Sequence, residues 1–339
     1  MDKKRVLLLA PPYMDIYKDI VSCLKQKGYE VIWVKDGQIS GNPYNKKNIT
    51  RHTKTVELYD KEVNSFWQSQ FSEWIDLPHF DYFLAIDGLM VSDNFFEELS
   101  KRNPSIKKVL FLYDRIEDNY ELDRFFCHYD KVFTFDISDS KKYGIFHLPI
   151  YWIPTSDNSQ VIYDIFGMAS FNSIRRYEIF KTVRQLAMEE GLRENIRLWH
   201  PHIDNRFLYI IKYTINRMLG KEMLSLSQFD DELFTEEAMA PNIFRMNIVS
   251  SKVILDTHTP YQDGLTARFM WALGAGKKII TTNDSAKDYP FYHPDQIFIL
   301  NNNYRGIIEF VNTPFRISDK YQDIIMRYRI DHWIDTLLY

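Results

Sequence analysis

Short apolar runs alternate with segments of helical periodicity through the first half of the chain. The apolar runs predict strands at 5–10, 30–34, 81–86, 108–113 and 132–135. Apolar residues spaced three or four apart predict helices at 14–27, 58–75, 93–102, 119–128 and 139–143, followed by an extended run at 145–153. Continuous apolar strands separated by helices are typical of a parallel sheet covered on both faces.

The same alternation begins again after a polar linker, Pro-Thr-Ser-Asp-Asn-Ser, at 154–159. Strands are predicted at 161–168, 196–199, 252–256, 278–282 and 297–300, and helices at 173–190, 206–219, 241–250, 264–274 and 318–338. Two successive α/β patterns predict two Rossmann-like domains, residues 1–155 and 156–318, with a cleft between them. Ligands of such sheets bind beyond the carboxyl ends of the strands.

Composition narrows the class of protein. The 339 residues are 45% hydrophobic and 26% charged, which excludes a disordered or fibrous chain and is typical of a soluble globular protein. The sequence shows neither an apolar run of ~18 residues nor a signal peptide. Two cysteines, Cys23 and Cys127, cannot form a disulfide framework, so a reducing cytoplasm is expected. A net charge of -4 predicts no attraction to nucleic acid.

Glycine is scarce, and this excludes several nucleotide-binding folds. The 12 glycines form neither GxGxxG nor GxxxxGK[ST], which disfavours a classical dinucleotide fold and a P-loop enzyme. HExxH, CxxC and GxSxG are also missing from the sequence. His200 and His202 would share one face of a strand, but no third ligand is spaced nearby, so no metal site is predicted.

The densest candidate chemistry lies between 253 and 283, where a strand leads through a loop to a helix predicted to begin near Gly264. Backbone N–H groups and the dipole at a helix start favour an anion. Thr266 would add a hydroxyl, and Arg268 a guanidinium on an exposed first turn. In the alternative interpretation, Asp263 and Thr266 only cap the helix and Arg268 lies on a solvated face. Both interpretations stay open from the residues alone.

Within this segment the chain resembles GT-B glycosyltransferases, close to the spore-maturation CgeB-like and capsular or lipopolysaccharide biosynthesis group. Those proteins show a run similar to GLTxRxxExLxxGKKxITTN. Matching residues here are Gly264-Leu265-Thr266, Arg268, Leu273, Gly276-Lys277-Lys278 and Ile280-Thr-Thr-Asn283. Further matches are Tyr113-Asp114-Arg115-Ile116, Val132 to Asp136 with Asp139 to Gly144, and Tyr163 to Ser170 with Arg175 and Arg176. The resemblance covers roughly residues 80–300.

The resemblance implies two Rossmann-like domains facing a central cleft, with a terminal helix, 319–339, returning to the first. It implies a cytoplasmic hexosyltransferase of surface polysaccharide biosynthesis, which moves a sugar from a nucleotide-sugar donor to a glycan or lipid-linked acceptor. No metal or other cofactor is expected. The residues we expect to contact the donor are Ser170, Arg175, His258, Asp263, Gly264, Leu265, Thr266, Arg268 and Trp271. For the helix start after Ser170, ordinary capping with two exposed arginines is the alternative.

The general base of the inverting members often lies near the end of the first strand. Asp15 occupies this region, and Asp114 resembles the aspartate that ends a later strand of the first domain. An ionised aspartate within ~3 Å of an acceptor hydroxyl can take its proton. Each residue has a structural alternative, because Asp15 suits the start of a helix and Asp114 suits a turn cap.

One position departs from the family. Trp271 stands where these enzymes commonly place a glutamate that accepts hydrogen bonds from the ribose hydroxyls. Tryptophan has no acceptor, although on the same helix face as Arg268 its ring could line the cleft. Alternatively, Trp271 packs in the core. The departure leaves two other functions open: a non-catalytic nucleotide- or glycan-binding protein, and a GT-B-like sugar-nucleotide epimerase.

The predicted helix 206–219 is apolar on most sides and carries Arg206, Lys212 and Arg217, with Lys221 beyond its end. This pattern favours a buried packing helix. The alternative is peripheral contact with the anionic inner face of a membrane.

Overall fold

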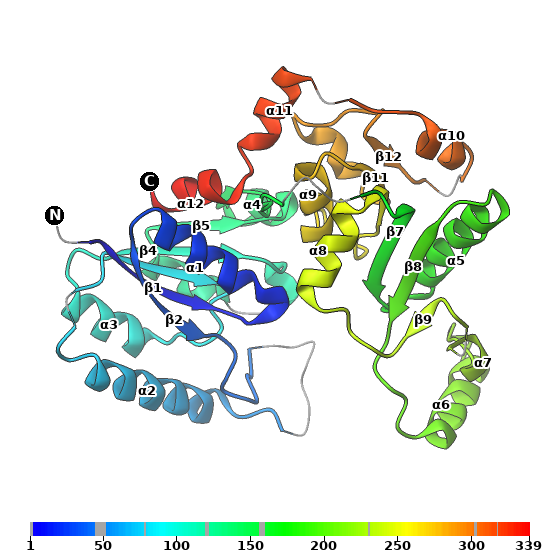
Figure 1. Ribbon diagram of the computed structural model, residues 1–339. Coiled ribbons are helices and arrows are strands. Elements are labelled where there is room, and N and C mark those ends of the chain that lie inside the picture. The colour runs from blue at the N-terminus through cyan, green and yellow to red at the C-terminus, as the bar shows by residue number, and fades with distance from the viewer. Residues whose placement is uncertain are drawn as a thin grey trace. The chain divides into compact units, whose positions relative to one another are not determined.

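The computed structural model describes residues 3–44, 52–77, 79–118, 122–155, 160–229, 231–301, 304–316 and 318–339. The chain divides into two compact units, each built around a six-stranded parallel sheet with helices (Figure 1). Unit 1 comprises Met1–Tyr151, Tyr261–Leu265 and Arg327–Tyr339, and unit 2 comprises Trp152–Pro260 and Thr266–Met326. The predicted linker falls largely outside the described residues, because 156–159 are not among them.

The sheet of unit 1 has the strand order β2-β1-β3-β4-β5-β6. Its strands are β1 (Arg5–Ala10), β2 (Glu30–Lys35), β3 (Tyr82–Ile86), β4 (Lys107–Leu112), β5 (Lys131–Thr134) and β6 (Phe146–His147). All pairings are parallel, which confirms the sheet type predicted from the apolar runs. The chain adds β2 on one side of β1 and β3 on the other, so the topological switch point lies between β1 and β3.

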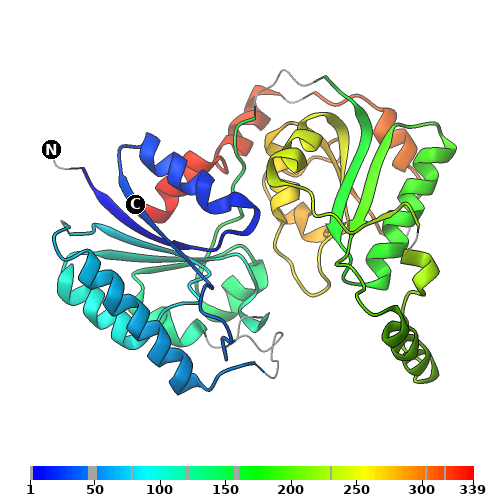
Figure 2. The ribbon, with the colours of Figure 1, turned by 60° about the horizontal axis from the view of Figure 1, so that its bottom comes forward.

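Helices cover both faces of this sheet, as Figure 2 shows. They are α1 (Ile16–Gln26), α2 (Val56–Glu73), α3 (Asp93–Arg102), α4 (Ile137–Tyr143) and α12 (Ile330–Leu338), with 3₁₀ turns at Tyr13–Asp15, Ile116–Asp118 and Leu122–His128. The first residues of the predicted helix 119–128 lie outside the described range. Trp67 of α2 is buried against Phe95 of α3, and its indole N–H donates to the Met90 carbonyl at 2.7 Å.

The sheet of unit 2 has the order β12-β11-β10-β7-β8-β9. Its strands are β7 (Tyr163–Ser170), β8 (Glu194–Trp199), β9 (Phe234–Thr235), β10 (Ser251–Asp256), β11 (Lys278–Thr281) and β12 (Ile297–Ile299). All of its pairings are parallel. Strands are added to β7 first on the β8 side and then on the β10 side, so the switch point lies between β7 and β10.

The helices of unit 2 are α5 (Ile174–Glu189), α6 (Arg206–Met218), α7 (Leu226–Phe229), α8 (Pro241–Val249), α9 (Ala267–Gly274), α10 (Ile307–Asn312) and α11 (Asp319–Met326), with a 3₁₀ turn at Asp284–Asp288. The prediction that α6 is a buried packing helix is wrong, because α6 contains no buried residue. No helix in the described ranges is long and apolar enough to cross a lipid bilayer.

The predicted terminal helix 318–338 is two helices, α11 and α12, and only α12 belongs to unit 1. The fully buried Trp333 anchors α12. Its indole N–H donates to the Pro149 carbonyl at 3.1 Å, and its ring meets Phe111 and Tyr151 edge-on, with centroids 4.8 and 4.9 Å away. At the helix end, Lys27 pairs with Asp335 at 2.7 Å.

We predict that Trp333→Ala destabilises unit 1 by about 3–5 kcal/mol, because it leaves a cavity under α12 and orphans a carbonyl. Urea denaturation followed by circular dichroism measures this free energy of unfolding. The control is His332→Ala on the exposed side of the same helix, which should change stability by less than about 0.5 kcal/mol. Equal effects of the two substitutions would contradict the anchoring role.

Candidate functional site

One buried carboxylate organises the carboxyl edge of the sheet in unit 2. Asp256 is the last residue of β10 and is 1% exposed. Its Oδ1 accepts from the Thr266 hydroxyl at 2.7 Å and from Arg268 Nε at 3.0 Å. Its Oδ2 accepts from the Thr281 hydroxyl, at the end of β11, at 3.0 Å. The predicted residues Thr266 and Arg268 are therefore brought together, on a carboxylate that the sequence analysis did not select.

Two arginines meet at the switch point between β7 and β10. Arg268 Nη1 donates to the Met168 carbonyl near the end of β7. Arg176, in the first turn of α5, donates to the carbonyls of Ser170 at 2.7 Å and Thr257 at 3.4 Å. Burial, and then the positive charge of Arg268, lower the pKa of Arg176 to about 10, so this guanidinium stays charged at neutral pH. With two guanidinium groups and one carboxylate, the cluster carries an excess positive charge.

Two polar groups of this cluster lack a hydrogen-bond partner among the described residues. Arg176 Nε and the hydroxyl of Thr257 are buried and make no hydrogen bond within the described part of the chain. Buried polar groups in native proteins are normally hydrogen-bonded, so two orphaned groups beside an excess positive charge suit an anionic ligand. At the same strand end, His258 Nδ1 lies 2.8 Å from the hydroxyl of Thr282, which follows β11.

The structure separates the two arginines that open unit 2. Arg175, the predicted donor contact, has an exposed side chain, whereas Arg176 is 8% exposed and makes the switch-point contacts. The predicted Ser170 contributes its carbonyl to Arg176. The sequence did carry a signal for this choice, because Arg176 falls at helical spacing with the buried Phe180 and Val183 of α5.

The predicted donor residues Asp263, Gly264 and Leu265 belong to unit 1. Asp136, which caps α4, accepts from the backbone N–H groups of Asp263 at 2.8 Å and Gly264 at 3.1 Å. Helix α9 begins at Ala267 behind Thr266 as its N-cap, so the prediction of a helix start near Gly264 is wrong. These two N–H groups are held by a carboxylate and are not displayed at a helix start.

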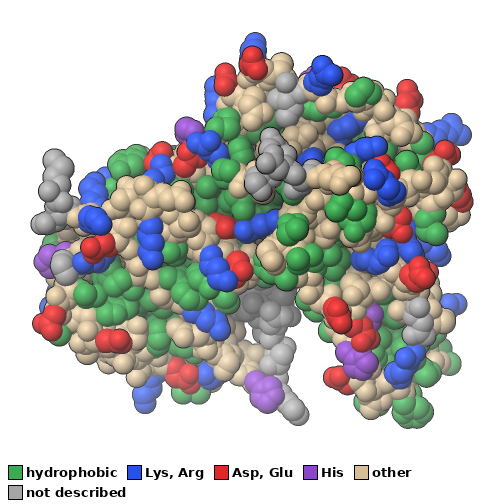
Figure 3. Space-filling model, viewed as in Figure 1, with side chains coloured by type: hydrophobic (Ala, Val, Ile, Leu, Met, Phe, Trp, Pro, Cys, Tyr) green, Lys and Arg blue, Asp and Glu red, His purple; other side chains and the backbone are tan. Residues whose placement is uncertain are grey.

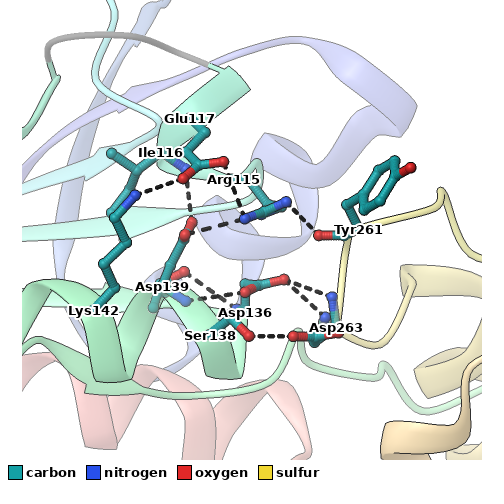
Figure 4. A network of polar contacts seen from close by, with 11 residues as sticks. Arg115, Ile116, Glu117, Asp136, Ser138, Asp139, Lys142, Tyr261 and Asp263 are labelled. Carbon is teal, nitrogen blue, oxygen red and sulfur yellow. Dashed lines mark hydrogen bonds and ion pairs between the residues drawn. The ribbon is translucent and has the colours of Figure 1, made fainter.

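Further contacts fix the segment Tyr261–Leu265 within unit 1. Figure 4 shows Arg115 donating to the Tyr261 carbonyl and the Ser138 hydroxyl donating to the Asp263 carboxylate. Leu265 is 1% exposed. A Cβ atom on Gly264 would lie 2.9 Å from the Phe135 carbonyl oxygen and still closer to the Phe135 ring, so only glycine fits there.

Two further expectations about α9 are wrong. Arg268 does not lie on an exposed turn, because its side chain is 10% exposed and paired with Asp256. Trp271 does not line an open surface, because it is 6% exposed and packs edge-on against Phe244 of α8. The Arg245 guanidinium lies over the Trp271 ring, 4.6 Å from its centroid. The core alternative for Trp271 is therefore the correct one.

Carboxylates gather at the corresponding edge of unit 1. Asp36, Asp87, Asp114 and Asp136 follow the ends of β2, β3, β4 and β5, and Asp15 follows β1. Asp114 is exposed, and the Asp15 side chain is 38% exposed and 3.0 Å from Lys18 Nζ. The structure thus leaves both predicted base candidates accessible to solvent, while their role stays a prediction.

Three carboxyl groups at this edge are buried: Asp136, which caps α4, and Asp36 and Asp87. Asp36 accepts from the N–H groups of Leu89 at 2.8 Å and Met90 at 3.0 Å, yet burial raises its pKa to about 6. Asp87 has a left-handed backbone and accepts from Tyr113 N–H at 2.8 Å. Burial first, and then the charge of Asp114, hold the pKa of Asp87 well above its usual range. Asp36 has no local motif that could have marked it in the sequence.

No protein-family model matches the sequence, and no curated protein matches it. Several solved structures, by contrast, do match this chain. Trehalose 6-phosphate synthase from Burkholderia multivorans is 12% identical with a TM-score of 0.55, covering 99% of this chain and 97% of that one. Starch synthase IV from Arabidopsis thaliana, as a catalytic domain bound to ADP and acarbose, is 9% identical with a TM-score of 0.57, covering 99% and 97%. An alpha-glucosyltransferase in complex with UDP and DNA is 12% identical with a TM-score of 0.53, covering 99% and 95%.

The chain has a two-domain GT-B fold. At these low identities the similarity shows the fold and not the chemistry. In open α/β sheets, ligands bind outside the carboxyl ends of the strands at the switch point. In unit 2 of this GT-B protein, that position is occupied by Arg176, Arg268 and Asp256.

We predict that Asp36→Asn changes the pH dependence of stability. Between the unfolded pKa of 3.8 and the folded pKa of about 6, native Asp36 keeps a proton that the unfolded chain has released. Its contribution to the unfolding free energy is therefore full below about pH 4 and falls as pH rises through about 6, by about 3 kcal/mol in total.

The measurement is the unfolding free energy of wild type minus that of Asp36→Asn, taken from about pH 4 to about pH 7. This difference should fall as pH rises. For the exposed control Asp123→Asn the same difference should stay flat. A flat line for Asp36→Asn would show that its carboxyl titrates alike in the folded and unfolded chains.

Proposed function

We propose that unit 2 binds the diphosphate of a nucleotide sugar and that the protein is a glycosyltransferase of the hexosyltransferase type. The observation that carries this proposal is the pair of guanidinium groups, Arg176 and Arg268, placed against the single carboxylate of Asp256 at the switch point. The sequence resemblance to GT-B glycosyltransferases supports it. Among the similar structures, the alpha-glucosyltransferase is a complex with UDP and the starch synthase is bound to ADP.

The proposed reaction needs positive charge at the leaving group. The acceptor hydroxyl oxygen bonds to the anomeric carbon of the sugar while the bond from that carbon to the diphosphate oxygen breaks. The hydroxyl proton passes to a carboxylate base, and the diphosphate leaves with one more negative charge. Arg176 and Arg268 would stabilise that charge as it grows, with no metal required. Asp15 and Asp114 are the proposed candidates for the base in unit 1.

The resemblance also supports a biological setting for the proposal. We propose a growing surface polysaccharide of the capsule or lipopolysaccharide type, or a lipid-linked glycan, as the acceptor, and the cytoplasm as the compartment.

His258, whose backbone N–H and ring are both hydrogen-bonded to the Thr282 hydroxyl, would lie beside the donor at the end of β10. Among the described residues no group of three or more metal-ligating side chains is present.

One observation favours a non-catalytic rival, a nucleotide- or glycan-binding protein with the same fold. Trp271 fills the position of the usual ribose-binding glutamate and is packed against α8, where it offers no acceptor. The two functions share the anion site and differ in turnover. Binding and turnover are therefore tested separately.

The binding test uses Arg176→Met, because Arg268→Ala would also leave the buried Asp256 carboxylate without its cation and cost about 3–5 kcal/mol of stability. Loss of charge-assisted hydrogen bonds worth about 1.5–3 kcal/mol should weaken nucleoside diphosphate binding about 10- to 100-fold. Isothermal titration with UDP, ADP and GDP measures this. The control is Arg316→Met, the same change at an exposed arginine of unit 2.

Arg176→Lys keeps the charge but not the planar fork and should bind with intermediate affinity. The melting temperature of each variant separates loss of the site from loss of the fold. A wild type that binds none of the three nucleotides, or an Arg176→Met variant that binds as tightly as wild type, contradicts the anion site.

The turnover test uses Asp114→Asn, which removes one of the two proposed base candidates and keeps its shape. Release of UDP from UDP-glucose and related donors should fall at least about 100-fold, while the Kd for UDP should stay within about twofold. Asp123→Asn, at an exposed site away from the strand ends, is the control. Measurable UDP binding without turnover of any donor by wild type would favour the non-catalytic rival.

A further inference from the structure

Helix α6 presents a continuous apolar surface to solvent. Figures 1 and 2 show it extending away from the sheet of unit 2, next to α7. The large apolar side chains that are 41% to 81% exposed in this region are Phe207, Leu208, Ile210, Ile211, Ile215, Met218 and Leu219. Figure 3 shows hydrophobic side chains in the same region, among basic, acidic and histidine side chains. Scattered apolar residues are normal on protein surfaces, but a helix face made of them marks an interaction site.

The opposite face of α6 holds it to unit 2. Tyr209, Tyr213 and Asn216 are the half-buried residues of the helix, and they recur at a spacing of three and four. The Tyr209 hydroxyl donates to the Leu224 carbonyl at 2.8 Å, and its ring meets Phe229 edge-on with centroids 5.9 Å apart. This anchoring fixes which side points outward. The apolar face therefore has no partner within the described residues of unit 2.

Charge selects the kind of partner. The segment 206–221 carries four cations, Arg206, Lys212, Arg217 and Lys221, and no aspartate or glutamate. Lys212 and Arg217 fall on either side of the apolar face on a helical projection. A second copy of the chain would place like charges against like charges in a symmetric contact. A lipid bilayer with anionic headgroups satisfies both features at once, since it takes up an apolar helix face and attracts the flanking cations.

We propose that α6 is a peripheral membrane anchor that lies in the plane of an anionic bilayer surface, with its apolar face in the headgroup–acyl boundary. The helix is 13 residues long, which suits an interfacial position and is too short for a span. This inference does not depend on the proposed glycosyltransferase activity, because it rests on the exposure and charge of α6 alone.

The experiment is sedimentation of the full chain with vesicles of phosphatidylcholine, with and without phosphatidylglycerol. Wild type should bind the anionic vesicles at least about tenfold more tightly than the neutral ones, and binding should weaken as salt is raised. The variant Phe207→Ser/Ile211→Ser/Met218→Ser removes three exposed apolar groups and should lose at least about tenfold in binding without a change in melting temperature. The matched control is Ile162→Ser/Met188→Ser/Met246→Ser, which changes three other exposed apolar residues of unit 2 and should bind like wild type.

A second variant, Lys212→Gln/Arg217→Gln/Lys221→Gln, keeps the apolar face and removes three charges. Each basic residue near an anionic surface contributes about fivefold, so binding should fall about 100-fold and lose most of its salt dependence. Absence of vesicle binding by wild type at low salt overturns the proposal. So does self-association of wild type, measured by analytical ultracentrifugation, that the serine variant abolishes without any vesicle binding. That result would assign the surface to a second copy of the chain.

Discussion

Burial of one carboxylate constrains the carboxyl edge of the sheet in unit 2. A buried charge is tolerated only when its partners surround it, and Asp256 draws them from the start of α9 and the end of β11. Thr266 caps α9 and also donates a hydrogen bond to Asp256, and Thr281 donates a second one from the end of β11. Arg268 neutralises the charge of the carboxylate. Because Arg268 also reaches the Met168 carbonyl of β7, the carboxylate fixes a cation at the switch point. Among the described residues, the second cation, Arg176, has no carboxylate of its own there, so it supplies the excess charge.

The two units use the same sheet geometry with opposite charge. Parallel strands bring the residues that follow them to one edge, so the identity of those residues sets the chemistry of the edge. In unit 1 they are mainly aspartates, and backbone N–H groups hold the buried ones. Asp136 has two tasks, since it caps α4 and fixes the segment Tyr261–Leu265 through the N–H groups of Asp263 and Gly264. An acidic edge suits proton transfer, and a cationic edge suits an anion.

Much of the fold could be predicted because each buried strand is a continuous apolar run, as in Val6 to Ala10, which is fully buried. The site was harder, because its decisive contacts join residues far apart in sequence. Asp136 and Asp263 are 127 positions apart, and no local pattern marks their pairing. The choice between Arg175 and Arg176 was open to prediction from helical periodicity, which places Arg176 on the buried face of α5. For α6, a wide apolar face is equally compatible with a core helix and with a surface helix, so the pattern alone could not decide whether the helix is buried.

Trp271 shows how packing limits what α9 can contribute to ligand binding. Three residues after Arg268, it would share the ligand-facing side if α9 were an isolated surface helix. Instead α8 lies against this side, where Phe244 meets the Trp271 ring and the Arg245 guanidinium covers it. The buried indole therefore stabilises the contact between α8 and α9. Arg268 reaches the switch point because its side chain is long, while Trp271 stays in the core. Under the proposed function, a group that recognises the ribose has to come from elsewhere in the chain. We propose His258 and Thr282 as candidates, since they lie at the strand ends with polar atoms at the edge of the same sheet.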